Sequence, residues 1–270
     1  MKVVIIGAGF VGLQVYNLIH RDHQVVVTTR SEQKQTEFIA QGVPAAVFHS
    51  QDLNTYFPLL ASADCLVVGV AAGMDDYRKT YLDLARRIVD HAPMMPLLQQ
   101  IVVMSSTSVY AESSGRLIDE RGQLESNQEN PKILIETENT YLELSQRLRV
   151  CIFRFGEIYG LTRSLKHKLS SLQGKEVPGD GSNRSNLIHV DDCARAIQFA
   201  ISQQLSGLYN LVCDDHFTRR ELYQSLAKKY QLAMPHFDPH RKSHHGKSKI
   251  VDNRLIKSMG FELKYPHLEL

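Results

Sequence analysis

A glycine-rich turn near the start of the chain constrains the fold more than any other feature. The sequence Gly7-Ala8-Gly9-Phe10-Val11-Gly12 directly follows an apolar run at residues 3–6 and opens a stretch with helical spacing. Here Gly7 permits a tight turn, Gly9 lets backbone amides approach a pyrophosphate, and Gly12 allows close packing of helix on strand. The helix N-terminus adds partial positive charge. We therefore expect a strand–turn–helix unit that binds a dinucleotide, with a purely structural glycine turn as the alternative.

Short apolar strands alternate with helical stretches through the first 160 residues. The predicted strands cover residues 3–6, 24–29, 45–48, 65–70, 101–104 and 150–155. The predicted helices cover residues 10–21, 31–40, 76–91 and 131–146. Because the strands are continuously apolar rather than alternating, both faces of their sheet should be covered by helices. The sequence thus predicts an α/β fold with a Rossmann doubly wound parallel sheet.

The pattern changes after Gly160. Residues 161–185 are basic and rich in Gly and Ser, and later segments predict strands at 187–190 and 208–212, helices at 192–202 and 219–230, and an irregular tail. We expect residues 1–160 and 186–202 to form the dinucleotide-binding core. Residues 161–185 and 203–270 should form a small C-terminal cap on the substrate side.

The composition argues against several classes of partner. With 31 Lys and Arg against 29 Asp and Glu, the formal net charge is +2, which gives no electrostatic case for nucleic-acid or membrane binding. No apolar run reaches the roughly 18–20 residues of a membrane span. Met1 leads directly into a strand, which predicts that there is no signal peptide. None of the four cysteines is paired at the spacing of a metal site or a redox motif, so we expect reduced thiols. We expect a cytoplasmic monomer or homodimer with a small-molecule substrate.

The end of the second predicted strand bears on the choice of cofactor. NAD-preferring sites place an acidic residue there to bind the ribose 2′-hydroxyl, whereas this strand ends Val27-Thr28-Thr29-Arg30. Arg30 can pair with a 2′-phosphate, and Thr29 can donate a hydrogen bond to it. Lys34, one helical turn later, could add a second cation, although a position on a solvated helix face explains it better. This pattern favours NADP(H) over NAD(H), although a solvated Arg30 remains the alternative.

Two further segments are placed to border a bound dinucleotide. Asp52 follows the third predicted strand, where an acid can hydrogen-bond an adenine amino group, although an Asx turn explains it equally well. Val70-Ala71-Ala72-Gly73 follows the fourth strand and supplies small residues where ribose and nicotinamide pass close to the backbone.

The hydroxyl-rich sequence Ser105-Ser106-Thr107-Ser108-Val109-Tyr110 follows the fifth predicted strand. Two further motifs accompany it, Arg154-Phe155-Gly156-Glu157-Ile158-Tyr159-Gly160 and Asn186-Leu187-Ile188-His189-Val190-Asp191-Asp192. With the glycine turn and the tail from Lys249, they resemble the extended and atypical short-chain dehydrogenase/reductases, in particular the NAD-dependent epimerase/dehydratase or nucleoside-diphosphate-sugar epimerase-like family. The resemblance spans essentially the whole chain.

The resemblance implies an oxidoreductase or isomerase that acts on a sugar nucleotide or a small carbonyl compound. It implies that Ser106 and Thr107 position the reacting oxygen, that Ser108 faces the substrate and that Ser105 borders the cofactor. Hydroxyls at this strand end could also stabilise developing negative charge. The alternative is that they only hold a turn together.

The sequence departs from the family at its usual base, a Tyr followed four residues later by a Lys that lowers the phenol pKa. No Tyr-x-x-x-Lys occurs in this chain, and matching Glu138 to the glutamate that usually follows the motif places Asn130 and Leu134 at the two positions. Asn130 is instead expected to cap a helix with Pro131 in its first turn. Five other residues are conceivable proton carriers, although each is more readily explained as structural: Tyr77, Tyr110, Tyr159, Glu157 and His189.

A His- and Lys-rich stretch lies near the C-terminus. His236, Asp238, His240, His244 and His245 match no zinc spacing, so we expect no metal. The resemblance implies that this region closes over the substrate, and that Lys247 and Lys249 contact the diphosphate of a sugar nucleotide. A solvated loop is the alternative.

Two functions therefore remain open. One is an NADP(H)-dependent enzyme with an unusual proton carrier. The other is a non-catalytic dinucleotide-binding protein that senses the redox state of NADP(H) or serves as a scaffold.

Overall fold

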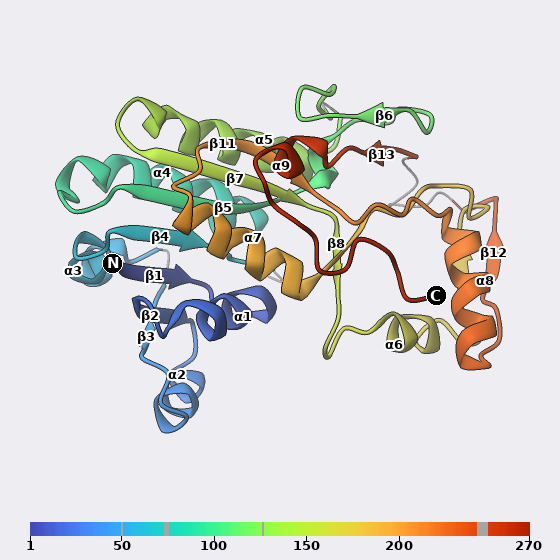
Figure 1. The fold of residues 1–270 in the computed structure, drawn as a ribbon, viewed down its shortest axis with the longest axis horizontal. Helices are drawn as coiled ribbons and strands as arrows, with labels where there is room; N and C mark the ends of the chain where they lie inside the picture. Colours follow the sequence, from blue (N-terminus) through green and yellow to red (C-terminus); the bar gives the residue numbers. More distant parts are fainter. Residues whose placement is uncertain (50, 73–75, 126, 242–247) are drawn as a thin grey trace.

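A seven-stranded parallel sheet forms the centre of the molecule (Figure 1). The computed structural model describes residues 1–49, 51–72, 76–125, 127–241 and 248–270. The strand order is β3-β2-β1-β4-β5-β7-β11, and every neighbouring pair runs in parallel. The strands are β1 (Lys2–Ile6), β2 (Gln24–Thr29), β3 (Ala45–Val47), β4 (Cys65–Val68), β5 (Gln100–Ser106), β7 (Arg149–Phe155) and β11 (Gly207–Leu211). The predicted Rossmann-type α/β fold is confirmed.

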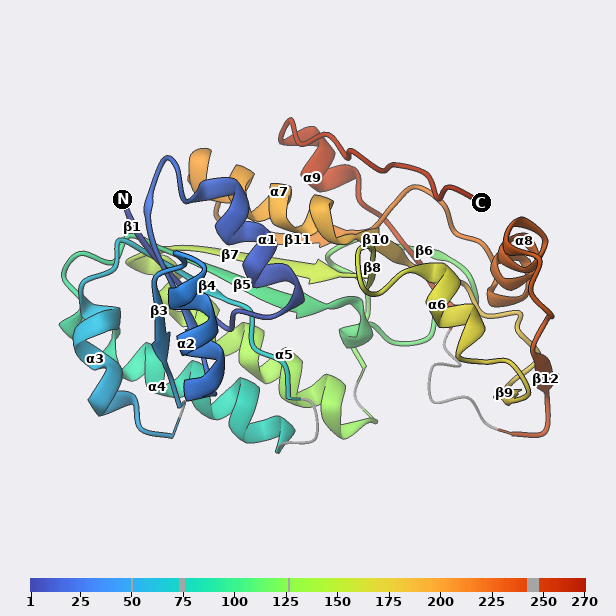
Figure 2. The same cartoon turned by 90° about the horizontal axis from the view of Figure 1, so that it is seen from below.

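Helices cover both faces of this sheet (Figure 2). On one face lie α1 (Phe10–Ile19) and α7 (Val190–Ser202), with α2 (Glu32–Ala40) at the β3 edge. On the other face lie α3 (Leu53–Ala61), α4 (Leu84–His91) and α5 (Glu129–Leu142). Successive residues of β1 alternate between the two cores: Val3 and Ile5 pack in one, Val4 and Ile6 in the other. This arrangement explains why the strands are apolar without alternation.

A smaller lobe lies beyond the carboxyl end of the sheet (Figure 2). It has its own apolar cluster, formed largely by α6 (Leu165–Ser170) and α8 (Arg219–Tyr230). Three two-stranded parallel ribbons lie at this end: β8 (Glu157–Tyr159) with β10 (Leu187–His189), β9 (Glu176–Pro178) with β12 (His236–Asp238), and β6 (Leu117–Ile118) with β13 (Ile250–Val251). The expectation that residues 203–270 all belong to the cap is wrong for β11. This strand pairs with β7 along five residues and therefore forms an edge of the central sheet.

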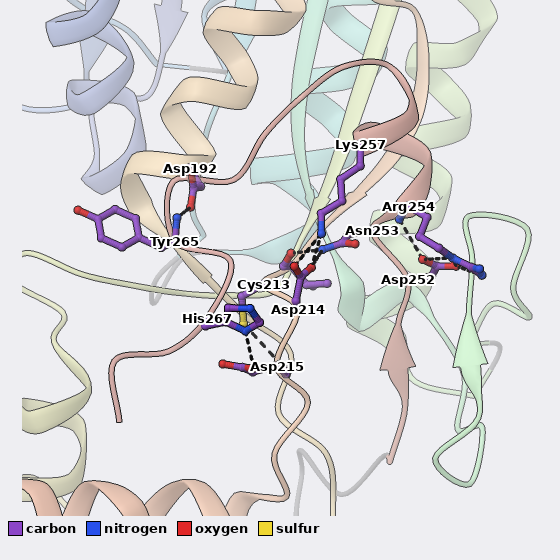
Figure 3. Close-up of polar contacts among 11 residues, drawn as sticks. Asp192, Cys213, Asp214, Asp215, Asp252, Asn253, Arg254, Lys257, Tyr265 and His267 are labelled. Carbon is purple, nitrogen blue, oxygen red and sulfur yellow. Dashed lines mark hydrogen bonds and ion pairs between the residues drawn. The ribbon is translucent and has the colours of Figure 1, made fainter.

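The C-terminal tail is fastened to the end of the sheet by polar contacts (Figure 3). Lys257, in α9 (Arg254–Ser258), pairs with Asp214 at 2.5 and 2.7 Å between Nζ and the carboxylate oxygens. The buried carboxylate of Asp192 accepts the backbone N–H of Tyr265 at 2.9 Å. The tail therefore anchors to the core as well as to the cap.

Several local predictions need adjustment. The helix expected over residues 76–91 contains a π-helical stretch, η1 (Lys79–Asp83), before α4 begins. Helix α5 begins at Glu129 with Gln128 as its N-cap, so Asn130 lies inside the first turn rather than at the cap. Among the described residues, no helix combines the length and apolar character needed to cross a membrane.

Candidate functional site

The glycine turn joins β1 to α1. Glycine is present at its three positions for different structural reasons. Gly7 has a φ of +102°, and a Cβ there would lie 2.6 Å from the carbonyl oxygen of Gly69. A Cβ on Gly12 would lie 2.3 Å from the carbonyl oxygen of Gly7. A Cβ on Gly9, in contrast, would meet nothing within 4 Å. Gly7 and Gly12 are thus required by packing, whereas Gly9 leaves open space beside the N-terminus of α1, as a pyrophosphate site requires.

Neighbouring strands hold this turn in place. The Gly7 amide donates to Oγ1 of Thr28 at 3.1 Å, and the Ala8 amide donates to the Thr28 carbonyl at 2.7 Å. Thr28 is buried in β2, so the turn is fixed against the adjacent strand. The glycine turn is therefore held in one conformation before any ligand binds.

A cavity of about 210 Å³ opens at this end of the sheet. The glycine turn, the end of β2 and the segment after β4 surround it. Its lining residues are Ile6, Gly7, Ala8, Gly9, Thr28, Thr29, Arg30, Lys34, Phe48, Gly69, Val70, Ala71 and Thr80. The structure thus brings Thr29, Arg30, Val70 and Ala71 together with residues 7–9 of the glycine turn, whereas residues 10–12 of the turn do not line this cavity. The lining positions of Phe48 and Thr80 were not foreseen, because no motif marks either residue.

Other predicted cofactor residues lie away from this cavity. The Asp52 carboxylate accepts the hydroxyl of Thr55 at 2.6 Å, which fits the alternative of a local turn. Ala72 is buried and does not line the cavity. The Ser105 hydroxyl donates to Oε1 of Glu138 at 2.5 Å, toward α5. Gly73 lies outside the described residues.

A second cavity of about 560 Å³ lies beside the carboxyl end of β5. Ser106, Thr107 and Ser108 all line it. Four cationic side chains also line it: Lys168, Arg184, Arg219 and Lys249. Among the described residues that line it, Glu157 is the only acid, and it pairs with Lys168. The cavity therefore carries an excess of positive charge that suits an anionic ligand.

The hydroxyl segment, residues 105–110, forms a short turn that already uses some of its hydrogen-bonding groups. Oγ of Ser106 accepts the backbone N–H of Ser108 at 3.1 Å, which caps a short 3-10 turn. The Nζ of Lys249 donates to the carbonyl oxygens of Thr107 and Tyr110, at 2.7 and 3.1 Å. Lys249 is predominantly buried, so the tail holds this turn in place while lining the cavity. Lys247 lies outside the described residues.

Helix α5 presents no Tyr–Lys pair to this cavity. Asn130 is exposed and does not line it, and the helix instead contributes Pro131, next to the capping Gln128. Leu134 is 4% exposed and packs with Val109 and Tyr110 in an apolar cluster. The position matched to lysine is thus part of the core, where a cation would lose its hydration.

Below this helix lies a buried polar network. The Arg154 guanidinium donates to both oxygens of Glu138, at 2.6 Å in its shortest contact, and to the Tyr110 hydroxyl at 2.9 Å. The Tyr110 hydroxyl donates in turn to Oδ1 of Asn210 at 2.6 Å. The network joins β7, α5, β11 and the hydroxyl segment. In the sequence, Glu138 marks only the alignment of the Tyr–Lys motif, and no local pattern predicts its pairing with Arg154.

Burial and neighbouring contacts set the state of each conceivable proton carrier. Burial raises the pKa of Tyr77, Tyr110 and Tyr159, opposite to the shift that a phenol base near neutral pH requires. Burial also lowers the pKa of His189, whose Nδ1 accepts the backbone N–H of Asp191 at 3.2 Å. Glu157 is paired with Lys168. These contacts agree with structural roles.

The histidine-rich stretch is described only in part. His236 and Asp238 belong to β12, and the His240 amide donates to Oδ1 of Asp238 at 2.9 Å. His244 and His245 fall outside the described residues. In the described part of the chain, no three His, Cys, Asp or Glu side chains gather as a metal site requires.

Comparison with known proteins places these features in a wider group. Residues 3–211 match the model of the NAD dependent epimerase/dehydratase family. A search of curated protein sequences found no significant match. Among solved structures, UDP-glucose 4-epimerase from Thermus thermophilus, in complex with NAD, superposes with a TM-score of 0.81 at 18% identity, covering 98% of this chain and 94% of that one.

Two further solved structures are similar. UDP-glucuronic acid 4-epimerase from Bacillus cereus, in complex with NAD, has a TM-score of 0.78 at 16% identity, covering 100% of this chain and 94% of that one. A functionally unknown conserved protein from Silicibacter pomeroyi has a TM-score of 0.80 at 20% identity, covering 98% and 94% of the two chains. At these identities the similarity establishes the fold.

Proposed function

The chain belongs to the NAD dependent epimerase/dehydratase family, and from this premise we propose that it binds NADP(H) and a sugar nucleotide in adjoining cavities. The observation that carries the proposal is the open space at Gly9, which lies in one cavity with Arg30 and Lys34. A cofactor bound there would supply hydride transfer through its nicotinamide ring.

The cofactor part of this proposal rests on charge and space at the end of β2. The backbone amides that begin α1 would bind the pyrophosphate, and Gly9 would leave room for it. Arg30 and Lys34 would hold a 2′-phosphate, and among the described residues no acidic side chain lines the cavity to favour a ribose 2′-hydroxyl instead. NAD in the similar epimerases supports a nicotinamide dinucleotide as the ligand class.

Replacing Arg30 by alanine tests the cofactor preference. We expect Arg30→Ala to weaken NADPH binding by about 10- to 100-fold, because a charge-assisted hydrogen bond contributes about 1.5–3 kcal/mol. NADH binding should change little. Calorimetric titration of both cofactors measures this, with Arg21→Ala, an exposed arginine just beyond α1, as the matched control. Equal loss for NADPH and NADH, or tighter binding of NADH by the unmodified protein, would contradict the 2′-phosphate site.

The substrate part rests on the second cavity. Its cations suit a diphosphate, and the hydroxyls of Ser106, Thr107 and Ser108 would face the sugar. The complexes of a similar protein, MoeE5, with UDP-glucose and with UDP-glucuronic acid support a sugar nucleotide as the ligand class. Lys247, which precedes Lys249 in the tail, is included in this proposal through the family resemblance alone.

Replacing Arg219 by alanine tests this assignment. We expect Arg219→Ala to weaken UDP-glucose binding by about 10-fold, because one charge-assisted contact to phosphate is lost. Arg220→Ala is the matched control, since the guanidinium of Arg220 lies over the Phe237 ring and does not line the cavity. Calorimetry with UDP-glucose, UDP and glucose reports which part of the ligand is affected. A variant that binds UDP as tightly as the unmodified protein would count against the diphosphate contact.

A non-catalytic role is the second candidate, and helix α5 favours it. Asn130 and the buried Leu134 occupy the two matched positions, so this helix lacks the phenol and ammonium groups of the family's proton-transfer pair there. Stereospecific hydride transfer between NADPH or NADP and a panel of sugar nucleotides and small carbonyl compounds would support an enzyme. Binding without turnover, with a partner that distinguishes NADP from NADPH, would support a redox sensor or scaffold.

A further inference from the structure

The segment that joins β8 to α6 begins with a closed turn. The Arg163 amide donates to the Gly160 carbonyl at 2.8 Å, and the Gly160 amide donates to the Arg163 carbonyl at 3.2 Å. Gly160 has a φ of +117°, and Leu161 has a φ of +43°, which is unusual for a residue with a side chain. Strained residues of this kind persist only where the surrounding structure holds them, and they concentrate at functional sites. The two hydrogen bonds of this turn therefore fix the backbone at Arg163.

This turn places a cation beside the glycine loop. The Arg163 guanidinium lies 4.6 Å from the centre of the Phe10 ring, and Phe10 is the first residue of α1, directly after Gly9. Residues more than 150 positions apart thus meet where the dinucleotide site begins. The side chain of Arg163 is exposed, and among the described residues no carboxylate forms an ion pair with it. Its charge is thus available to a ligand.

The electrostatics of this position favour an anion. The N-terminus of a helix carries partial positive charge, and the first turn of α1 contains no acidic residue. An arginine at the same end adds to this positive potential rather than balancing it. An anionic group that entered the open space at Gly9 would interact with the helix amides and with the guanidinium together.

We propose that Arg163 is a cofactor-binding residue that reaches from the cap side of the chain and pairs with the pyrophosphate of the dinucleotide. This inference rests on the proposed function, because it needs a dinucleotide at the glycine loop. It also assigns a role to the turn at 160–163: the turn keeps the guanidinium stacked on Phe10 so that little side-chain ordering is needed on binding. The cofactor would then link the Rossmann core to the segment that carries Lys168 and the second cavity.

The test uses ligands that share or lack the pyrophosphate. We expect Arg163→Gln to weaken ADP-ribose and NADP binding by about 10- to 100-fold, the loss that one charge-assisted hydrogen bond produces. Binding of 2′-AMP, which has no pyrophosphate, should be unchanged. The affinity of the variant for ADP-ribose should also depend less steeply on salt concentration, because one charge contact is missing. Lys166→Gln is the matched control, since its ammonium lies 5.6 Å from the Tyr230 ring, within the cap.

The possible results distinguish a failure of this inference from a failure of the proposed function. Unchanged affinity of Arg163→Gln for ADP-ribose overturns this inference alone, provided that the unmodified protein binds it. An equal loss for 2′-AMP and ADP-ribose also overturns it, because the residue would then act through the fold. If the unmodified protein binds neither ADP-ribose nor any nicotinamide dinucleotide, the proposed function fails and takes this inference with it.

Discussion

Glu138→Ala is expected to lower the free energy of unfolding by about 3–5 kcal/mol, because it leaves Arg154 as an uncompensated buried charge. The two side chains are only 3% and 4% exposed, so water cannot replace the lost carboxylate. The substitution also removes the acceptor of the Ser105 hydroxyl. Equilibrium denaturation in urea, followed by circular dichroism, measures the change.

Two further variants show whether the effect belongs to the buried pair. Glu136→Ala, on the same helix, removes only exposed ion pairs of 3.8–3.9 Å with Arg78 and Arg86, and it should cost less than about 1 kcal/mol. The double variant Glu138→Leu/Arg154→Met should recover much of the lost stability, because it leaves no unpaired charge. A single variant as stable as the Glu136→Ala protein would refute the importance of the pair.

Gly12→Ala and Gly9→Ala are expected to separate stability from ligand binding. The Cβ of alanine at position 12 would lie 2.3 Å from the Gly7 carbonyl oxygen, and moving α1 from β1 should cost about 1–3 kcal/mol or more. At Gly9 the backbone has a φ of −90° and a Cβ meets nothing within 4 Å, so stability should change by less than about 0.5 kcal/mol.

Ligand affinity should respond in the opposite order, with Gly9→Ala weakening binding more than Gly12→Ala does. In Gly9→Ala the new methyl group occupies space proposed for the pyrophosphate, so NADP affinity should fall at least about 10-fold, equivalent to about 1.4 kcal/mol. Thermal denaturation and calorimetry on the same samples measure both quantities. A Gly9→Ala protein that keeps full affinity would show that this space is not the pyrophosphate site. A Gly12→Ala protein of unchanged stability would show that α1 can move without cost.

Local sequence was sufficient to place six of the seven strands in the central sheet. Strands such as Val3–Ile6 in β1 are apolar on both faces, and the glycine turn stands directly between strand and helix. The apolar pattern and the turn residues therefore predict the same strand–turn–helix unit. Helix α3 was not predicted, and Pro58 lies inside it, where local propensity argues against a helix. The edge strand β11 was assigned to the cap because sequence position gives no information on which sheet a late strand joins.

The candidate site likewise has one part that local sequence predicts and another that depends on tertiary packing. Arg30, Thr29 and the glycine turn line one cavity because their distances along the chain are set by a single βαβ unit. Ser106 and Lys249, in contrast, come from positions 143 residues apart, and their meeting depends on how the tail packs. The pairing of Glu138 with Arg154, and the contact of Arg163 with Phe10, depend likewise on packing between distant elements.

What the sequence determined by itself was therefore the Rossmann fold, the glycine turn between β1 and α1, and the absence of the Tyr-x-x-x-Lys motif. These follow from residues close together in the chain, whose periodicity and turn chemistry are local properties. Tertiary structure alone decided which cations surround the second cavity, that Leu134 belongs to the core, and that Arg163 lies at the glycine loop. The physical reason is that burial and charge pairing depend on which distant segments pack together, and a single sequence does not display those contacts.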